Sequence, residues 1–269
     1  MKEEKIACAV FSFDRPDYFK QVLDSFLRNE NHNEFDWYFF QDASEINGKK
    51  YGDINKINKN IELIENFQTE TKELNVATAN QGIAKQKQKA HHLFQNYNKI
   101  IFFEDDMIVS KYYLRLLLQL SKEFPNTVIQ ASDRAIDPNK HDFIANLSKV
   151  HYVLKQHWWG YLMPKSIAKL VIPTLNEYIN FIGNDYRKRP DAKIRKKYKV
   201  HATSHDAILE TTINDANQKR LATFIPRAKY IGKEGLHSTS ATYKKQGFEV
   251  EKMYEFEEDK HLENFGVIE

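Results

Sequence analysis

The run from Lys99 to Met107 constrains the fold of this chain more than any other segment. Its apolar part, Ile100–Phe103, consists of β-branched and aromatic residues, a composition typical of a strand buried in a parallel sheet. Glu104, Asp105 and Asp106 follow directly. Because adjacent carboxylates repel one another, folding alone does not require them there. In open α/β sheets, ligands bind outside the carboxyl ends of the strands, so this run predicts a site as well as a strand.

Strand and helix patterns alternate through the first half of the chain. Strands are expected at 6–13, 35–40, 73–76 and 99–103, and helices at 17–28, towards the end of 44–60, at 82–94 and at 112–124. This alternation predicts βαβ units with right-handed crossovers. The second half is less regular, with short strands expected at 128–131, 151–154, 221–225 and 229–231, and helices at 167–181 and 205–218. We therefore expect an α/β, Rossmann-like fold, with a mostly parallel sheet flanked by helices and a mixed second half.

The composition predicts one large globular unit or two tightly joined ones. The 269 residues are 41% hydrophobic and 13% aromatic, which is enough for a core and argues against disorder. Cys8 is the single cysteine, which excludes an internal disulfide and favours a reducing compartment. The charged segment 1–5 does not resemble a signal peptide, and no stretch approaches the roughly 20 apolar residues of a membrane span. We expect a cytoplasmic protein, with peripheral contact at the inner membrane face left open.

Polar residues follow the first strands of the predicted sheet. Arg15 comes after the first strand and Asp42 after the second, while Asn80 and Gly82 open a helix. Because carboxyl ends of parallel strands share one edge, these residues and the acid run should lie on one rim. The free N–H groups of that helix could face an anion. Carboxylate oxygens suit Mg²⁺ or Mn²⁺, which would hold a phosphorylated substrate, although a solvated acidic loop is the alternative.

These motifs, in this order, resemble the nucleotide-sugar glycosyltransferases of the GT-A fold. The resemblance is carried by Val10-Phe-Ser-Phe-Asp-Arg-Pro16, Gln41-Asp42, Asn80-Gln-Gly-Ile-Ala84 and Phe103-Glu-Asp-Asp106. The acid run resembles the Asp-X-Asp metal motif, and its Glu-Asp-Asp form is most similar to the N-acetylglucosaminyltransferase that begins complex N-glycan branching. The resemblance is patchy after residue 110. It implies a nucleotide-sugar-binding half at 1–110, an acceptor-binding and catalytic half at 111–240 of the same GT-A domain, and a tail or lid at 241–269.

The resemblance also implies how the rim would be used. Asp106 would bind Mn²⁺ (or Mg²⁺), which would bridge the two phosphates of the nucleotide-sugar and neutralise the departing diphosphate. Glu104 and Asp105 would contact ribose or base-side groups, and Asp42 would accept a hydrogen bond from a base N–H. The other rim residues expected to bind the nucleotide-sugar are Phe11, Arg15, Asn80 and Gly82. Lys85 and Lys89 lie one helical turn apart and could face the diphosphate, or form a solvated helix face.

The segment His157-Trp-Trp-Gly-Tyr161 contains two adjacent tryptophans and a glycine. A tryptophan can stack on a sugar face, and Gly160 allows the backbone to approach a ligand closely. In the similar family, a Trp-Gly element lies beside the donor sugar and acceptor, which implies this position for Trp159 and Gly160. Plain core packing is the alternative, and we expect it for one of the two tryptophans.

Two later motifs supply a candidate base and a candidate metal ligand. Ser204-His-Asp-Ala207 begins a predicted helix, where Ser204 can act as the cap and an acid can stabilise the helix dipole. In the similar inverting enzymes, an acid at a corresponding helix start deprotonates the acceptor hydroxyl, so we expect Asp206 to be the general base, with Asp185 as the fallback. Gly235-Leu-His237 resembles the family's C-terminal metal-binding histidine. His237 is therefore a candidate Mn²⁺ ligand, with a structural histidine as the alternative.

The sequence thus predicts a metal-dependent glycosyltransferase of hexosyltransferase type. It would move a sugar from a nucleoside-diphosphate sugar, by family default a UDP-sugar, to an acceptor hydroxyl, with inversion. The acceptor is left open between a glycan, a lipid-linked sugar and another hydroxyl-bearing molecule. The basic run 187–199 has few interleaved aromatics, which disfavours a nucleic-acid acceptor and leaves an anionic acceptor or a phospholipid surface as alternatives to a solvated face.

Two other functions are compatible with the same acids. A nucleotidyltransferase acting on sugar phosphates also holds Mg²⁺ at a parallel-sheet edge, but would normally carry a glycine-rich basic loop where this chain has Ser12-Phe-Asp-Arg-Pro16. A non-catalytic nucleotide- or glycan-binding module would keep the fold without turnover, and the intact acid run and Asp206 argue against it. The oligomeric state is not predicted.

Overall fold

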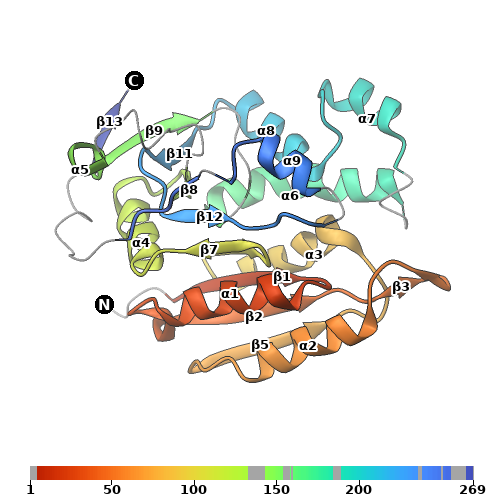
Figure 1. The fold of residues 1–269 in the computed structure, drawn as a ribbon. Helices are drawn as coiled ribbons and strands as arrows, with labels where there is room; N and C mark the ends of the chain where they lie inside the picture. The colour runs from red at the N-terminus through yellow and green to blue at the C-terminus, as the bar shows by residue number, and fades with distance from the viewer. Residues whose placement is uncertain are drawn as a thin grey trace.

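The structure is a computed structural model, and it describes residues 5–132, 143–153, 158, 160–183, 189–235, 238–249, 251–255 and 265–268. The main sheet contains β1 (Ile6–Ser12), β2 (Phe35–Gln41), β5 (Thr71–Val76), β6 (Lys99–Glu104), β8 (Val128–Gln130), β9 (Lys149–Val153), β10 (Tyr161–Pro164), β11 (Arg220–Thr223) and β13 (Gly266–Ile268). Within the described residues these nine strands follow the order β13-β9-β11-β8-β10-β6-β1-β2-β5. Figure 1 shows β1, β2 and β5 towards one end of this sheet and β9 and β13 towards the other.

The first half of the chain forms the parallel part of the sheet. β1 pairs in parallel with both β2 and β6, and β2 pairs in parallel with β5. The register places Phe11 opposite Glu104 and Ser12 opposite Gln41. The carboxyl ends of these strands therefore meet at one edge, as predicted from the strand–helix alternation.

The second half of the sheet is mixed. β11 pairs in parallel with β8, and β13 pairs in parallel with β9. β10 runs antiparallel between β6 and β8, and β11 runs antiparallel to β9. β10 has only four residues, so it is too short to show a strand period and is not predicted from the sequence. Two further antiparallel pairs lie outside the main sheet, β7 (Met107–Val109) with β12 (Ala228–Tyr230) and β3 (Glu45–Ile46) with β4 (Lys49–Lys50).

The helices cover both faces of the sheet. One face carries α1 (Pro16–Leu27), α2 (Ile54–Glu65) and α4 (Tyr113–Glu123), and the other carries α3 (Gly82–Ala90), α6 (Lys165–Ile182) and α8 (His205–Asp215). Successive β1 side chains alternate between the two faces, so Cys8 and Val10 pack with the first group and Ala7, Ala9 and Phe11 with the second. Shorter helices are η1 (His32–Glu34), η2 (His91–Gln95), α5 (Phe143–Asn146), α7 (Asp191–Tyr198) and α9 (Ser240–Lys245).

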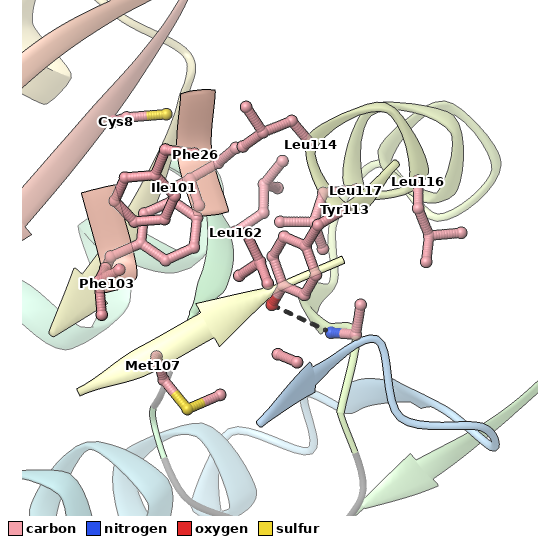
Figure 2. Packing of buried hydrophobic residues seen from close by; sticks show 14 of the residues in the cluster. Cys8, Phe26, Ile101, Phe103, Met107, Tyr113, Leu114, Leu116, Leu117 and Leu162 are labelled. Carbon is pink, nitrogen blue, oxygen red and sulfur yellow. Dashed lines mark hydrogen bonds between the residues drawn. The ribbon is translucent and has the colours of Figure 1, made fainter. Parts of the chain in front are cut away.

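The core beneath the acid run is closely packed. Figure 2 shows Phe26 of α1 against Phe103 of β6, and their ring centroids are 4.6 Å apart. Leu114 and Leu117 of α4 are fully buried in the same cluster. This packing holds the end of β6 firmly in place, because buried side chains of this size fill the space between helix and sheet.

The described part of the segment after residue 240 packs on the rest of the fold. Tyr243 and Phe248 are buried against Tyr230, and the Tyr243 hydroxyl donates to the Tyr230 carbonyl at 2.9 Å. β13 extends the main sheet beside β9. Among the described helices, none is long and apolar enough to cross a bilayer.

Candidate active site at the carboxyl edge of the sheet

A cavity of about 410 Å³ opens where β1, β2 and β6 end. It is lined by residues that the sequence analysis had singled out, namely Phe11, Arg15, Asp42, Asn80, Gly82, Glu104, Asp105, Asp106 and Asp206. It is also lined by residues that were not anticipated, including Tyr230, His205 and, from beyond residue 240, Thr242, Gln246 and Phe248. The structure thus brings the acid run and the start of α8 to the same cavity.

Two of the remaining candidates, Lys85 and Gly160, do not line this cavity. Lys85 is half-buried on α3 and is absent from the lining. Gly160 is buried against Tyr113, whose hydroxyl donates to the Gly160 carbonyl. A Cβ added at Gly160 would lie 2.9 Å from that hydroxyl, so the absence of a side chain at Gly160 leaves room for the buried Tyr113. The other three candidates, Trp159, Asp185 and His237, fall outside the described residues.

Arg15 bridges two of the three acids. Its Nη1 lies 2.7 Å from Asp106 Oδ2, and its Nη2 pairs with Asp105 Oδ1. Asp105 and Asp106 are 3% and 4% exposed, so the guanidinium partly neutralises two buried carboxylates. Burial lowers the pKa of Arg15, but the charges of Asp105 and Asp106 outweigh it, and the pKa lies above its ordinary value. Arg15 is therefore a fixed positive charge beside the acid run.

Asp106 has the properties expected of a metal ligand. Burial raises its pKa, Arg15 lowers it, and Asp105 and Glu104 raise it again, which leaves the pKa at about 7. Its Oδ1 is buried without a hydrogen-bond partner among the described residues. A Cβ added at Gly232 would lie 2.5 Å from Asp106 Oδ2, so the glycine leaves room for this carboxylate. A buried, unpartnered carboxylate oxygen fits Mn²⁺ or Mg²⁺.

The described residues do not form a complete metal cage. No group of three or more His, Cys, Asp and Glu side chains converges within the part of the chain that the structure describes. Magnesium-type sites commonly use one or two carboxylates and take their other ligands from water and substrate phosphates. Asp106 is thus compatible with a metal that is shared with a phosphorylated ligand.

Asp42 is bonded to the start of α3. Its Oδ1 accepts a hydrogen bond from the Gln81 backbone N–H at 2.8 Å, and its Oδ2 accepts one from Gly82 at 2.8 Å. The Asn80 side-chain amide donates to the same carboxylate at 3.2 Å. Burial raises the pKa of Asp42 in spite of these bonds. Asp42 therefore caps α3 from the end of β2. The free N–H groups at the start of this helix were expected to face a bound anion, and the N–H of Gly82 instead donates to Asp42.

The sequence pattern did not indicate Lys87 as a site residue and pointed to Lys85 and Lys89 instead. Lys87 is 1% exposed, and its Nζ lies 2.9 Å from Glu104 Oε1 and 3.3 Å from Asp206 Oδ1. A signal was present, because Ala84, Lys87 and Ala90 follow at intervals of three and share one helix face. That apolar face packs on the sheet, so the lysine at its centre is buried.

Asp206 lies in the first turn of α8, and the predicted cap is confirmed, because Ser204 Oγ accepts a hydrogen bond from the Ala207 N–H at 3.3 Å. The Oδ1 atom of Asp206 is 2.9 Å from His205 Nε2, and the Asp206 side chain is 30% exposed and lines the cavity. Burial raises the pKa of Asp206, but His205 and Lys87 together outweigh it and hold the pKa below its usual range. Asp206 is thus an ionised carboxylate at neutral pH.

Comparisons with known proteins bear on the fold. No protein-family model and no curated protein matches this chain. Among solved structures, residues 1–349 of Staphylococcus aureus TarS in complex with UDP-GlcNAc match with a TM-score of 0.52 and 12% identity over 87% of this chain and 60% of that one. The same TarS segment crystallised alone gives a TM-score of 0.49 and 11% identity over 85% and 61% of the two chains.

A third match is the mannosyltransferase PcManGT from Pyrobaculum calidifontis in complex with GDP-Man and Mn²⁺. It has a TM-score of 0.43 and 12% identity over 61% of this chain and 45% of that one. The chain spans between 35% and 61% of the TarS chains that it matches. The match with the TarS–UDP-GlcNAc complex establishes the overall fold, and with the strand order above it confirms the expected α/β fold of GT-A type.

Proposed function

We propose that this chain is a metal-dependent glycosyltransferase of hexosyltransferase type that transfers a sugar from a nucleoside-diphosphate sugar to an acceptor hydroxyl. The observation that carries the proposal is that Asp106, a carboxylate with an unpartnered buried oxygen, and Asp206, a carboxylate paired with Lys87 and His205, line one cavity. A UDP-sugar donor is supported by the likeness of the fold to TarS in complex with UDP-GlcNAc.

The donor would bind at the edge where β1 and β6 end. Asp106 would hold Mn²⁺ or Mg²⁺, and the bound metal would supply Lewis-acid neutralisation of the departing diphosphate. Arg15 is a second positive charge at that edge and can donate charge-assisted hydrogen bonds to phosphate oxygens. From the sequence resemblance we further propose that His237 completes the metal site and that Trp159 stacks on the sugar.

The acceptor would approach from the side of α8. Asp206 takes the proton of the acceptor hydroxyl as the hydroxyl oxygen forms a bond to the anomeric carbon. The bond from that carbon to the diphosphate oxygen breaks, and its electron pair leaves with the nucleoside diphosphate. Attack from the face opposite the leaving group inverts the anomeric centre. We keep Asp185 as the alternative base, since a general base needs only hydrogen-bond reach and the correct ionisation.

The two halves of this mechanism correspond to two parts of the chain. We propose that 1–110 binds the donor and that 111–240 binds the acceptor, with 241–269 as a tail or lid. Support for the last assignment comes from Thr242, Gln246 and Phe248, which form part of the cavity wall. The acceptor remains a hydroxyl-bearing molecule such as a glycan or a lipid-linked sugar.

Binding and hydrolysis of a panel of nucleotide-sugars, with and without Mn²⁺, test this proposal. We expect one donor to bind only with the metal and to be hydrolysed slowly. Asp206→Asn should lower transfer by about 10²- to 10⁴-fold, the usual contribution of a general base, while donor affinity stays the same. Asp106→Asn should instead abolish the metal-dependent part of donor binding. If no nucleotide-sugar binds or is hydrolysed under any metal condition, the proposal is wrong.

A further inference from the structure

We infer that Lys87 is a positioning residue that joins the acid run to the candidate base, holding Asp206 at the donor edge of the cavity. This inference rests on the proposed function. The ammonium group contacts Glu104 at the end of β6 and Asp206 at the start of α8. Glu104 and Asp206 are 102 positions apart in the sequence, and Lys87 belongs to a third element, α3. One side chain thus links three elements that each contribute to the cavity.

Burial makes this link specific. A lysine is almost never fully buried unless its charge is paired, because desolvation of the ammonium group is costly. At 1% exposure, Lys87 is stable only with its two carboxylate partners. Burial alone would lower the pKa of Lys87, but Asp206 and Glu104 raise it above its ordinary value, so the side chain stays charged. The lysine cannot turn to solvent, and it therefore restrains both carboxylates.

Several other ionisable groups surround this pair. The groups that act on Lys87 or Asp206 from the packed elements are His205 on α8, His91 on η2, Tyr161 on β10, Arg220 on β11 and Glu104 on β6. Arg220 is itself paired with Glu210 at 2.9 Å, and the Tyr161 ring lies 5.8 Å from Lys87 Nζ. Among the described basic groups around Asp206, Lys87 is the one that also contacts the acid run.

The consequence for catalysis follows from the geometry. Asp206 must be ionised and must point at the acceptor hydroxyl beside the donor, and its contact with Lys87 supports both conditions. Without the ammonium group, His205 would be left to oppose the effect of burial on the pKa of Asp206, so the carboxyl would take up its proton at a higher pH and the side chain could rotate away from the donor edge. Loss of Lys87 should therefore lower kcat, leave donor affinity largely intact and move the acid limb of the pH–rate profile to higher pH.

The test compares Lys87→Gln and Lys87→Arg with a control, Lys122→Gln, an exposed lysine on α4 on the opposite face of the sheet. The first readout is carbon-13 NMR of the Asp206 carboxyl, which needs neither donor nor turnover. In Lys87→Gln we expect its titration midpoint to rise by about 1 to 3 pH units, the usual effect of losing an opposite charge at this distance. Lys87→Arg keeps the charge and should leave the midpoint near that of the wild type.

The second readout is kcat and KM for transfer across pH. Lys87→Gln should lower kcat and move the acid limb of the pH–rate profile to higher pH. Lys87→Arg should restore part of the lost kcat, and Lys122→Gln should match the wild type. An unchanged Asp206 midpoint in Lys87→Gln would overturn the inference. So would a loss of donor affinity as large as the loss of kcat, since this would place Lys87 at the donor itself.

The design also covers a folding failure and a failure of the proposed function. If Lys87→Gln does not fold, the wild-type titration decides, because an Asp206 midpoint at or above the ordinary carboxyl value contradicts restraint by Lys87. If the Asp206 midpoint responds to Lys87→Gln but no nucleotide-sugar is turned over, the link between the two residues stands and the glycosyltransferase proposal fails. If transfer occurs but the Asp206 midpoint does not respond to Lys87→Gln, the glycosyltransferase proposal stands and the inferred role of Lys87 is wrong.

Discussion

The guanidinium of Arg15 lies 2.7 Å from the carboxylate of Asp106. A metal cation bound to the same carboxylate would therefore lie close to the positive charge of Arg15. Two positive charges at a few ångströms repel one another, even when the surrounding protein is strongly polarisable. Arg15 and a divalent metal should therefore compete for Asp106 until a diphosphate supplies further negative charge.

Arg15→Gln should bind Mn²⁺ more tightly than the wild type when no nucleotide is present, by about tenfold, which corresponds to about 1.4 kcal/mol of relieved repulsion. The same variant should bind the nucleoside diphosphate more weakly, because a phosphate-facing cation is lost. Calorimetric titration with Mn²⁺ alone, and then with nucleotide, measures both effects. Arg28→Gln, an exposed arginine on the other end of α1, is the control and should change neither. Weaker Mn²⁺ binding by Arg15→Gln would contradict the prediction.

Gly232→Ala should damage the metal site through a steric effect. The added Cβ would lie 2.5 Å from Asp106 Oδ2 and 2.6 Å from the Tyr230 hydroxyl, so one of these groups must move. We expect a loss of about 1–3 kcal/mol in the free energy of unfolding, as for other overpacked sites, together with weaker Mn²⁺-dependent nucleotide binding. Gly266→Ala is the matched control, since no atom lies within 4 Å of its added Cβ. Equal behaviour of the two variants in both assays would show that the space at Gly232 is not required.

Asp42→Ala should destabilise the protein by removing the carboxylate that caps α3. Replacing a helix cap costs about 0.5–2 kcal/mol, and the N–H groups of Gln81 and Gly82 would lose their acceptor. Asp53→Ala provides a comparison, because Asp53 caps α2 by accepting from the Asn55 N–H at 2.9 Å. Urea denaturation should detect a loss in both variants, whereas only Asp42→Ala should weaken nucleotide binding. Full nucleotide affinity in Asp42→Ala would argue that the α3 terminus does not shape the donor site.

His91 should make the folded state sensitive to acid. Burial and the neighbouring charge of Lys87 lower its pKa to about 3, whereas an unfolded histidine titrates near 6.5. The unfolded state therefore takes up a proton first as the pH falls, and stability decreases below about pH 6.5. By linkage, this one group should remove about 2 kcal/mol between neutral pH and pH 5.

His91→Phe should remove this part of the pH dependence, because the ring packs against Phe94 and Phe102 and phenylalanine keeps the aromatic contact. Urea denaturation at neutral pH and at pH 5 gives the difference in unfolding free energy for each protein. The exposed His201→Gln variant should retain the wild-type difference. A difference in His91→Phe as large as in the wild type would mean that other groups cause the acid sensitivity.

Much of the fold could be predicted from local pattern. The continuous apolar runs that became β1, β2 and β6 indicated a parallel sheet, and the polar residues after them had to share an edge. This is why Arg15, Asp42 and Asp106 were expected on one rim, where the structure places them around one cavity. β10 was not predicted, because a segment of four residues carries no period that separates a strand from a loop.

The sequence by itself determined where the apolar strands end and which acids follow them. These features depend only on residues that are close together in the sequence. Only the tertiary structure decided that Lys87 is the buried lysine of α3, that Asp42 caps that helix, and that Glu104 and Asp206 share one ammonium group. These contacts join residues between 17 and 119 positions apart. Long-range packing, and not the local pattern, decides which face of α3 packs on the sheet. It also decides that α8 begins near the end of β6, where both elements reach Lys87.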